Sequence, residues 1–317
     1  MRLTLAERVS ESFPVRPVCR LLGVSRSGLY ARRCRQESAR SREDRRLKQK
    51  ILEIHLQTRR CYGTPRVEQE LRAHGTRTSR KRVARLRKEL GIWTRYRRKY
   101  RRSKDSDPKL AVAPNHLQRR FESSQADRIW VGDFTFLHCG GRFLYLAILL
   151  DLYSRRVVGW HVSANPDEDL SLQALEKALA QRDPQRGLLH HTDQGSVYRG
   201  KDYSKLLSSA GGVASMSRRG DCWDNAVAES FFKTLKAELG DRFSSFKAAR
   251  RELFSYIEGF YNTRRLHSTL GYLSPAQFER QAMAQASPRR PPVMHPSRRS
   301  TSVTRNASPE SDLMEQP

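Results

Sequence analysis

Apolar positions recur with helical spacing over the first third of the chain. In residues 17–33, PVCRLLGVSRSGLYARR, a short apolar helix is followed by Gly23 and then by Ser25, the expected N-cap of a second helix. This spacing is typical of a helix-turn-helix. A second pair of helices is predicted from residues 65–73 and from the stretch after Ser79, where apolar residues fall three and four positions apart. The first third is therefore expected to be helical.

The pattern changes to strands at about residue 128. Apolar, β-branched and aromatic residues fill three segments, 128–139, 142–154 and 155–163, and Gly140-Gly141 marks a tight turn between the first two. These segments predict an antiparallel meander. The elements expected after it are a helix at 167–181, a strand at 187–193, a helix at 199–210, a strand at 213–218 and helices at 224–239 and 246–263. This order is that of an RNase H-like α/β fold, with a five-stranded mixed sheet and helices on both faces.

Positive charge is concentrated near the N-terminus of this 317-residue chain. The formal net charge is +28 and the sequence pI is about 10.7, and residues 1–105 alone account for +22 of that charge. Such a balance favours a polyanionic partner, either nucleic acid or an anionic membrane surface. The best apolar run, at 143–152, is shorter than the roughly 18 residues that a spanning helix needs. We therefore expect a nucleic-acid partner and no membrane.

The helix after Ser79 is predicted to present a basic face. Its members are Arg80, Lys81, Arg85, Arg87 and Lys88. A run of charges is often no more than a solvated helix surface, but two helix pairs with this net charge favour DNA binding. Residues 95–120, which include RYRRKYRRSK and two prolines, predict a linker that follows the DNA backbone.

The cysteines give no sign of a disulfide framework or of a zinc site. There are five, they are scattered, and none forms a CxxC pair. The N-terminus has no continuous apolar segment of the signal-peptide type. We expect reduced thiols in a cytoplasmic protein.

Two acids interrupt the predicted sheet. Asp133 lies within the first strand, in WVGDFTFL, and Asp193 ends the fourth, in LLHHTDQGS. In an RNase H-like sheet these strands are neighbours, about 4.8 Å apart, so the two carboxylates would repel each other if nothing compensated their charge. A lone acid at such a place is more often a turn cap, and Asp151 is interpreted as structural. The pair together suggests a site.

A third acid, Glu229, lies in the predicted helix WDNAVAESFFKTLKAEL. It flanks the apolar stripe that should pack on the sheet, which consists of Val227, Phe231, Leu235 and Leu239. Glu229 is therefore expected to reach the sheet edge where the two aspartates meet. Three carboxylates with only oxygen ligands predict a site for Mg²⁺, or for Mn²⁺. Two such ions bind the attacking and leaving oxygens in phosphoryl transfer.

Lys236 follows Glu229 by seven residues, about two turns of helix, so both lie on one face. One interpretation is an ordinary Glu–Lys helix surface. The other is a cation beside the metal site that holds a DNA phosphate.

These residues resemble a known family. The motifs are VCRLLGVSRSGLYARR, YGTPRV, WVGDFTFL, LLDLYSRRVVGW, HTDQGSVY, DCWDNAVAESFFKTLKAEL and YNTRRLHSTLGYLSPAQF. Together they are similar to insertion-sequence transposases of the DDE, retroviral-integrase-like superfamily, specifically the OrfB-type catalytic subunit. From Asp193 to Glu229 there are 35 intervening residues, which is the D(35)E spacing of that family. The resemblance covers roughly residues 15–280.

The resemblance implies a DNA transposase in which Asp133, Asp193 and Glu229 bind two Mg²⁺. Cleavage at the ends of the element would free a 3′-hydroxyl, which then attacks target DNA. The family also implies a multimer on paired terminal inverted repeats, and a smaller partner from the upstream reading frame (OrfA-type), often joined to the chain by frameshifting. No heptad run is present here, so we expect this chain to need that partner.

The resemblance also suggests a role for Arg264 and Arg265 in the segment YNTRRLH, either in DNA contacts or in packing near the active site. A basic helix C-terminus would explain both residues equally well.

The expected domain limits follow from these patterns. They are a helix-turn-helix-like segment at 1–40, a basic helical DNA-binding domain at 41–105, a linker at 106–122, an RNase H-like integrase catalytic core at 123–283 and a disordered basic tail at 284–317. A bacterial, nucleoid-associated location is expected with these domains.

Two other functions fit parts of the sequence. A non-enzymatic DNA-binding regulator would use the basic helices alone, but it has no need of three acids at the D(35)E spacing. A structure-selective nuclease of the same fold would use the same acids, and only an assay for joined products separates it from a transposase.

Overall fold

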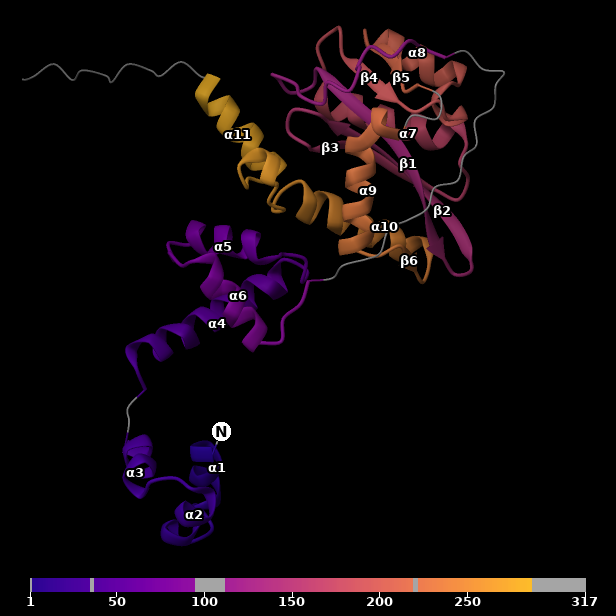
Figure 1. Ribbon diagram of the computed structural model, residues 1–317. Helices are drawn as coiled ribbons and strands as arrows, with labels where there is room; N and C mark the ends of the chain where they lie inside the picture. The colour runs from indigo at the N-terminus through magenta and orange to yellow at the C-terminus, as the bar shows by residue number, and fades with distance from the viewer. Residues whose placement is uncertain (1, 35–36, 95–111, 219–221, 287–317) are drawn as a thin grey trace, which may run out of the picture.

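The protein consists of two groups of N-terminal helices followed by an α/β unit. The computed structural model describes residues 2–34, 37–94, 112–218 and 222–286. Figure 1 shows the two helical groups at the lower left and the α/β unit at the upper right, with α9 and α10 on the side of the sheet that faces the second group. Within the described residues, no helix combines the length and apolarity needed to cross a bilayer. The stretch RYRRKYRRSK, part of the predicted linker and most of the predicted tail lie outside these residues.

The first group has three short helices and a small core of its own. They are α1 (Arg2–Val9), α2 (Val15–Leu22) and α3 (Arg26–Cys34), and their buried residues include Ala6, Val18 and Leu29. Gly23 ends α2 with φ 63°, a left-handed conformation that favours glycine. The Ser25 hydroxyl accepts a hydrogen bond from the backbone N–H of Gly28 at 3.0 Å. The predicted helix pair and its cap are therefore confirmed.

The second group consists of α4 (Ala39–Gln57), α5 (Thr64–Ala73) and α6 (Arg80–Glu89). Apolar residues of the three helices form their common interior, among them Ile51, Leu71 and Leu86. Ser79 caps α6 by accepting from the N–H of Arg82 at 3.3 Å, as expected from its position before the apolar repeat.

The basic face of α6 needs one correction. Arg80, Lys81, Arg85 and Lys88 are exposed as predicted, but Arg87 is only 6% exposed. Position 87 lies four residues after the buried Val83, on the stripe that packs against the other two helices. Its guanidinium reaches Thr64 Oγ1 at 3.4 Å, and burial lowers the pKa of Arg87. Arg87 therefore belongs to the interior of this group and not to a DNA-facing surface.

The α/β unit is built on a mixed sheet in the order β3-β2-β1-β4-β5. Its strands are β1 (Ile129–Cys139), β2 (Arg142–Asp151), β3 (Val157–Ser163), β4 (Leu189–Thr192) and β5 (Val213–Met216). The first three pair antiparallel, and β4 pairs parallel with both β1 and β5. Gly140 and Gly141 both have positive φ in the hairpin between β1 and β2, as a tight primed turn requires. The RNase H-like sheet is therefore confirmed.

A short additional strand and several helices complete the unit. The two-residue strand β6 (Arg242–Phe243) pairs with the end of β1, and is too short to produce a sequence pattern. The helices are α7 (Glu168–Arg182), α8 (Lys201–Ser209), α9 (Ala226–Glu238), α10 (Phe246–Tyr256) with a π-helical extension at Ile257–Tyr261, and α11 (Pro275–Ala286).

Alternating residues of the sheet supply two apolar layers. In β2, Ile148 and Leu150 pack on the side of α9 and α10, whereas Ala147 and Leu149 pack on the side of α7 and α8. The sheet is thus covered on both faces, and the parity of a residue in a strand determines which helices its side chain meets.

Candidate active site

The pairing of β1 with β4 places Asp133 and Asp193 at the same end of neighbouring strands. Val131 is paired with His191 in parallel register, and each aspartate lies two residues further along its own strand direction. Because side chains alternate between faces, Asp133 lies on the face of Val131, which is the face covered by α9 and α10. The predicted convergence of these two residues follows from the register.

Backbone N–H groups orient both carboxylates. Asp133 Oδ1 accepts from the N–H of Phe134 at 2.9 Å, and Asp193 Oδ1 accepts from the N–H of Gly195 at 3.0 Å. A Cβ atom at Gly195 would lie only 2.8 Å from Asp193 Oδ1. The glycine of HTDQGS therefore leaves room for the carboxylate to fold back on its own turn.

The negative charges of both aspartates affect the pKa of one buried tyrosine. Tyr198 ends the short 3₁₀ turn Ser196–Tyr198, and its ring lies 6.4 Å from that of Phe134. Burial raises the pKa of Tyr198 well above its usual value, and the negative charges of Asp133 and Asp193 add to the effect. Both carboxylates therefore belong to one electrostatic neighbourhood.

Helix α9 presents Glu229 from its first turn. The Asn225 side chain precedes the helix and donates through Nδ2 to the backbone oxygen of Gly132 at 3.0 Å, so the helix start is tied to β1 next to Asp133. The side chain of Glu229 is 16% exposed, with Lys233 Nζ at 3.6 Å from its Oε2. The N-terminal end of a helix favours negative charge at this place.

The three acids come from separate elements, namely β1, the end of β4 and α9. Across the described ranges, no group of three His, Cys, Asp or Glu side chains has the arrangement of a metal-binding site. The β1–β4 register places the two aspartates at one end of the sheet, and Asn225 ties the start of the helix that carries Glu229 to β1. All the donors are carboxylate oxygens, a set that suits Mg²⁺ and Mn²⁺.

Lys236 lies further along α9, over β1. Its Nζ donates to Thr135 Oγ1 at 2.7 Å and lies 4.7 Å from the centre of the Phe136 ring. Thr135 is two residues beyond Asp133 and on the same face of the strand. The lysine thus lies on the α9 face of β1, close to the aspartate along the strand.

Asp224, which is not among the predicted site residues, connects several segments at the turn before α9. It is fully buried, and it accepts hydrogen bonds from Asn115 Nδ2 at 2.8 Å, Arg119 Nε at 2.8 Å and the backbone N–H of Arg218 at 3.0 Å. The Arg218 guanidinium also binds it and, with Arg119, holds the pKa of Asp224 well below its usual range. In the sequence it is simply an acid at the start of the helix predicted at 224–239, in WDNAVAE.

The two C-terminal arginines have different environments. Arg264 is exposed. Arg265 is 5% exposed and makes a bidentate ion pair with Glu238, with Nη2 at 2.7 Å from Oε1 and Nε at 2.9 Å from Oε2. Burial alone would lower the pKa of Arg265, but Glu238 outweighs it and the pKa is raised. The suggested DNA contact is thus corrected for Arg265, because its guanidinium is buried and bound to Glu238 at the end of α9.

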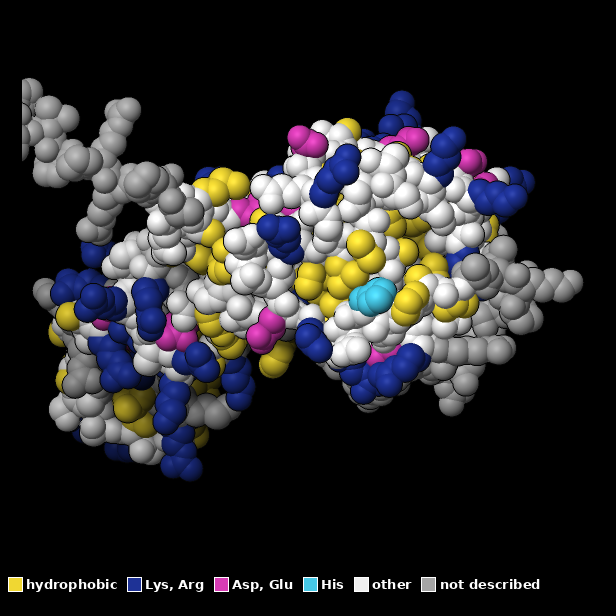
Figure 2. All heavy atoms as spheres, turned by 90° about the horizontal axis from the view of Figure 1, so that it is seen from above, with side chains coloured by type: hydrophobic (Ala, Val, Ile, Leu, Met, Phe, Trp, Pro, Cys, Tyr) yellow, Lys and Arg dark blue, Asp and Glu magenta, His cyan; other side chains and the backbone are white. Residues whose placement is uncertain are grey.

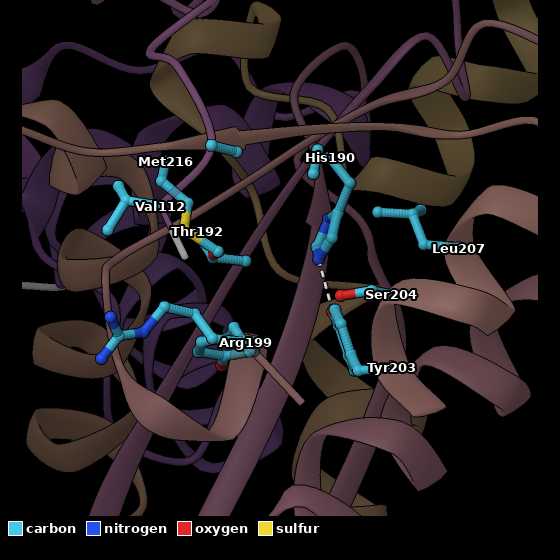
Figure 3. Close-up of a pocket in the computed structure, with 11 residues that line it drawn as sticks. Val112, His190, Thr192, Arg199, Tyr203, Ser204, Leu207 and Met216 are labelled. Carbon is cyan, nitrogen blue, oxygen red and sulfur yellow. Dashed lines mark hydrogen bonds between the residues drawn. The ribbon is translucent and has the colours of Figure 1, made fainter. Parts of the chain in front are cut away.

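A cavity of about 270 Å³ lies beside β4 and β5, on the side of α8 (Figure 3). His190 and Tyr203 point toward each other there, with His190 Nε2 and the Tyr203 hydroxyl 2.5 Å apart. Arg199, Leu207 and Met216 also line it, and none of the three acids does. The cavity is therefore separate from the acidic site.

The surface charge is uneven, as the sequence predicted. On the face seen in Figure 2, Lys and Arg side chains are most crowded at the left, over the N-terminal helical part, and are more widely spaced over the α/β unit. The helical part thus offers the more strongly cationic surface to a polyanion.

Family comparisons agree with this arrangement. A family model described as Integrase core domain matches residues 123–222, a second one of the same description matches residues 211–275, and an HTH-like domain matches residues 41–100. An RNase H-like sheet with these matches defines an enzyme of the DDE nucleotidyl transferase class, the class of integrases and transposases.

Two relatives cover most of the chain. The Insertion element IS600 uncharacterized 31 kDa protein of Shigella sonnei is 41% identical over 82% of this chain and 97% of its own length. Transposase InsF for insertion sequence IS3A of Escherichia coli (strain K12) is 36% identical over 90% of this chain and 100% of its own length. The chain belongs to the IS3-family transposases. Among solved structures, an intasome of simian T-cell lymphotropic virus in complex with PP2A regulatory subunit B56 gamma is similar, with a TM-score of 0.41 and 15% identity over 80% of each chain.

Proposed function

We propose that this transposase cuts the ends of its insertion element and joins the freed 3′-hydroxyl to target DNA with the help of two divalent metal ions. The observation that supports the proposal most directly is the β1–β4 register, in which Asp133 and Asp193 follow paired residues at one end of neighbouring parallel strands. Asp133 lies on the face covered by α9 and α10. Glu229 extends from the first turn of α9 at the D(35)E spacing.

The donor set fits Mg²⁺. The integrase-core family depends on divalent metal ions, and Asp133, Asp193 and Glu229 offer only carboxylate oxygens. When bound, the two ions would activate the attacking oxygen and stabilise the leaving oxygen of the phosphodiester.

The protein's own residues would orient the reactants. The N–H groups of Phe134 and Gly195 each donate to one carboxylate oxygen and so orient the two aspartates. Lys236 holds a positive charge on the same face of β1, where it would attract a DNA phosphate.

The DNA and protein partners follow from the same proposal. The exposed basic residues of α6, namely Arg80, Lys81, Arg85 and Lys88, would bind the phosphates of the terminal inverted repeats, with Arg264 as a further contact. Arg80 and Arg85 also form intramolecular ion pairs, with Glu68 and with Asp44 and Glu89 respectively. We further propose a multimer on DNA and an OrfA-type partner from the upstream frame, acting separately or as a fusion.

A strand-transfer assay tests the proposal. Purified protein, with its upstream partner and Mg²⁺, should join a labelled inverted-repeat 3′ end to a target plasmid. Cleavage that never yields a joined product would favour a nuclease of the same fold and would contradict the proposal.

The Asp133→Asn variant tests the assignment of the acids. It should bind inverted-repeat DNA as the wild type does in a gel-shift titration, while cleavage falls by at least roughly a thousandfold. Asp202→Asn, at an exposed acid on α8, should cleave normally. Equal loss of binding and cleavage in Asp133→Asn would show that the residue maintains the fold and has no specific part in the chemistry.

A further inference from the structure

The connection from α4 to α5, together with the first turn of α5, fastens the HTH-like helices to the α/β unit. We name residues 59–66 the latch. Its centre is Tyr62, which is fully buried. The Tyr62 hydroxyl donates to the backbone oxygen of Arg264 at 3.1 Å and accepts from the backbone N–H of Leu266 at 2.8 Å. One phenol therefore satisfies two backbone groups of the YNTRRLH segment, more than 200 residues away in the sequence.

Two arginines hold the latch on either side of Tyr62. Arg66 Nε donates to the backbone oxygen of Leu266 at 2.8 Å, and its guanidinium lies 5.7 Å from the centre of the Tyr62 ring. Arg59 donates to Ser255 Oγ at 2.7 Å and lies over the Tyr256 ring at 5.7 Å. The contacts combine hydrogen bonds with cation–π interactions, so the orientation of the segment is fixed in more than one direction.

The latch also meets the end of α9. Glu238, the last residue of that helix, binds Arg265, and its Oε2 accepts from the Tyr256 hydroxyl at 2.8 Å. On the latch side, Cys61 Sγ lies 3.8 Å from the backbone oxygen of Glu238. Arg265 is directly between the two backbone groups that Tyr62 holds. Latch, buried ion pair and helix end thus form one continuous set of contacts.

The position of α9 is therefore determined at both ends. Asn225 ties its start to β1, and Glu238 ties its end to the buried ion pair. Glu229 lies nine residues before Glu238, or about 13–14 Å at 1.5 Å per residue. If the helix end moved away, Arg265 would be left as a buried charge without its partner, which is costly in free energy. The end of α9 therefore has one strongly preferred position.

We infer that Tyr62 is a positioning residue for Glu229, and that the latch couples the HTH-like domain to the helix that presents this acid. The inference rests on the proposed function for the role of Glu229. In the latched arrangement, DNA held by the HTH-like helices reaches the acids at a fixed orientation, so the position of the cut relative to the bound sequence is fixed as well. Loosening the latch should therefore spread the cuts over several positions while leaving the affinity for DNA unchanged.

The Tyr62→Phe variant tests this coupling, since it keeps the ring and removes the hydroxyl. Tyr30→Phe, at a half-exposed tyrosine on α3, is the matched control. Tyr62→Phe should keep its gel-shift affinity for inverted-repeat DNA and its cooperative thermal unfolding. Cleavage should slow by roughly 10- to 100-fold, the effect of a displacement of about 1 Å at a reacting group. On a sequencing gel the cuts should spread over several positions, whereas Tyr30→Phe should cut at the wild-type position.

A second readout reports on the latch itself. Cys61, within the latch, is 7% exposed. Its reaction with a maleimide, followed by mass spectrometry of the peptide, should be slow in the wild type and several-fold faster in Tyr62→Phe. Cys19, buried in the first helical group, should react equally slowly in both. If Tyr62→Phe does not fold, Arg66→Lys, which loses the Nε donor to Leu266, replaces it in both measurements.

The outcomes distinguish this inference from the proposal on which it rests. If Tyr62→Phe cleaves at the wild-type rate and position while Glu229→Gln is inactive, the inference about the latch is overturned and the proposed function stands. Full cleavage by Glu229→Gln would overturn the role of the glutamate and the latch with it.

Discussion

Individual arginines and lysines in this protein have two different roles. Arg87 and Arg265 are buried and bound within the protein, whereas Lys81, Lys88 and Arg264 are exposed. Within α6, one position along the helix decides the role. Arg87 lies on the packed stripe that contains Val83, whereas Lys88, the next residue, lies beside that stripe. A count of charges from the sequence treats these residues as equivalent, although their environments in the structure differ.

This contrast yields a prediction for DNA binding. Lys88→Ala should weaken binding to any DNA sequence and should lower the slope of log affinity against log salt by about 0.9, the value for one phosphate contact. Arg87→Ala should instead lower the melting temperature, because it removes a buried side chain and opens a cavity between α5 and α6. A fluorescence-anisotropy salt series and a thermal melt measure the two effects. A large salt-slope change in Arg87→Ala with no loss of stability would contradict the assignment.

Because several titratable residues are buried, we expect the folded protein to lose stability in mild acid. Burial lowers the pKa of His190 from 6.5 to about 4, and lowers that of His267 further. The unfolded chain binds these protons more readily, so the stability from neutral histidines is present above about pH 6.5 and is lost as the pH falls toward the folded values. Asp151 opposes this, because burial raises its pKa to about 6 and its protonation favours the folded state between about pH 6 and 4.

His191 is shifted in the same direction, so three buried histidines oppose one aspartate, and the net loss of stability is roughly 2–3 kcal/mol per pH unit between about pH 6 and 5. Urea unfolding at several pH values measures the slope. His190→Gln should reduce the slope, whereas Asp151→Asn should make it steeper. A wild-type stability that rises as the pH falls over this range would contradict the burial of neutral histidines.

At the scale of elements, close approach between helices and sheet determines which substitutions the core tolerates. Gly159 in β3 lies directly beneath α7, where a Cβ atom would be 2.3 Å from the backbone oxygen of Ala174. A backbone atom cannot give way as a flexible side chain can, so α7 would have to move away from the sheet. The glycine thus allows the close contact between α7 and β3.

Gly159→Ala should therefore destabilise the protein by at least about 2 kcal/mol, through overpacking. Gly259→Ala is the matched control, since a Cβ there has no neighbour within 4 Å and its φ is not in the left-handed region. That control should be neutral or stabilise by up to about 1 kcal/mol. Chemical denaturation compares the two variants. Equal stability of both would mean that α7 is free to shift on the sheet.

At the scale of the whole molecule, the features that could be predicted from the sequence are those whose interacting residues lie close together in the chain. Strand alternation and the Gly140-Gly141 turn are local patterns, so the meander and the RNase H-like order were predictable, and parallel pairing of β1 with β4 then placed Asp133 beside Asp193. The domain limits and the roles of the three acids remain predictions.

Long-range partners could not be predicted in the same way. Arg265 looked like a DNA contact because its partner, Glu238, lies 27 residues earlier, at the end of α9. The contact of Tyr62 with Arg264 spans 202 positions, and no periodicity connects residues at that distance. Buried Asp224 resembled an ordinary acid at a helix start, although it holds together segments more than 100 residues apart.

Mn²⁺ binding, followed by electron paramagnetic resonance, is the measurement that tests the central claim most directly. Titrations should compare the wild type with Asp133→Asn, Asp193→Asn and Glu229→Gln in the presence of inverted-repeat DNA, with Asp202→Asn as control. If the three carboxylates share one divalent-metal site, each of the three variants should weaken Mn²⁺ binding by at least roughly tenfold, and the control should not. Unchanged Mn²⁺ affinity in all three variants would contradict the account.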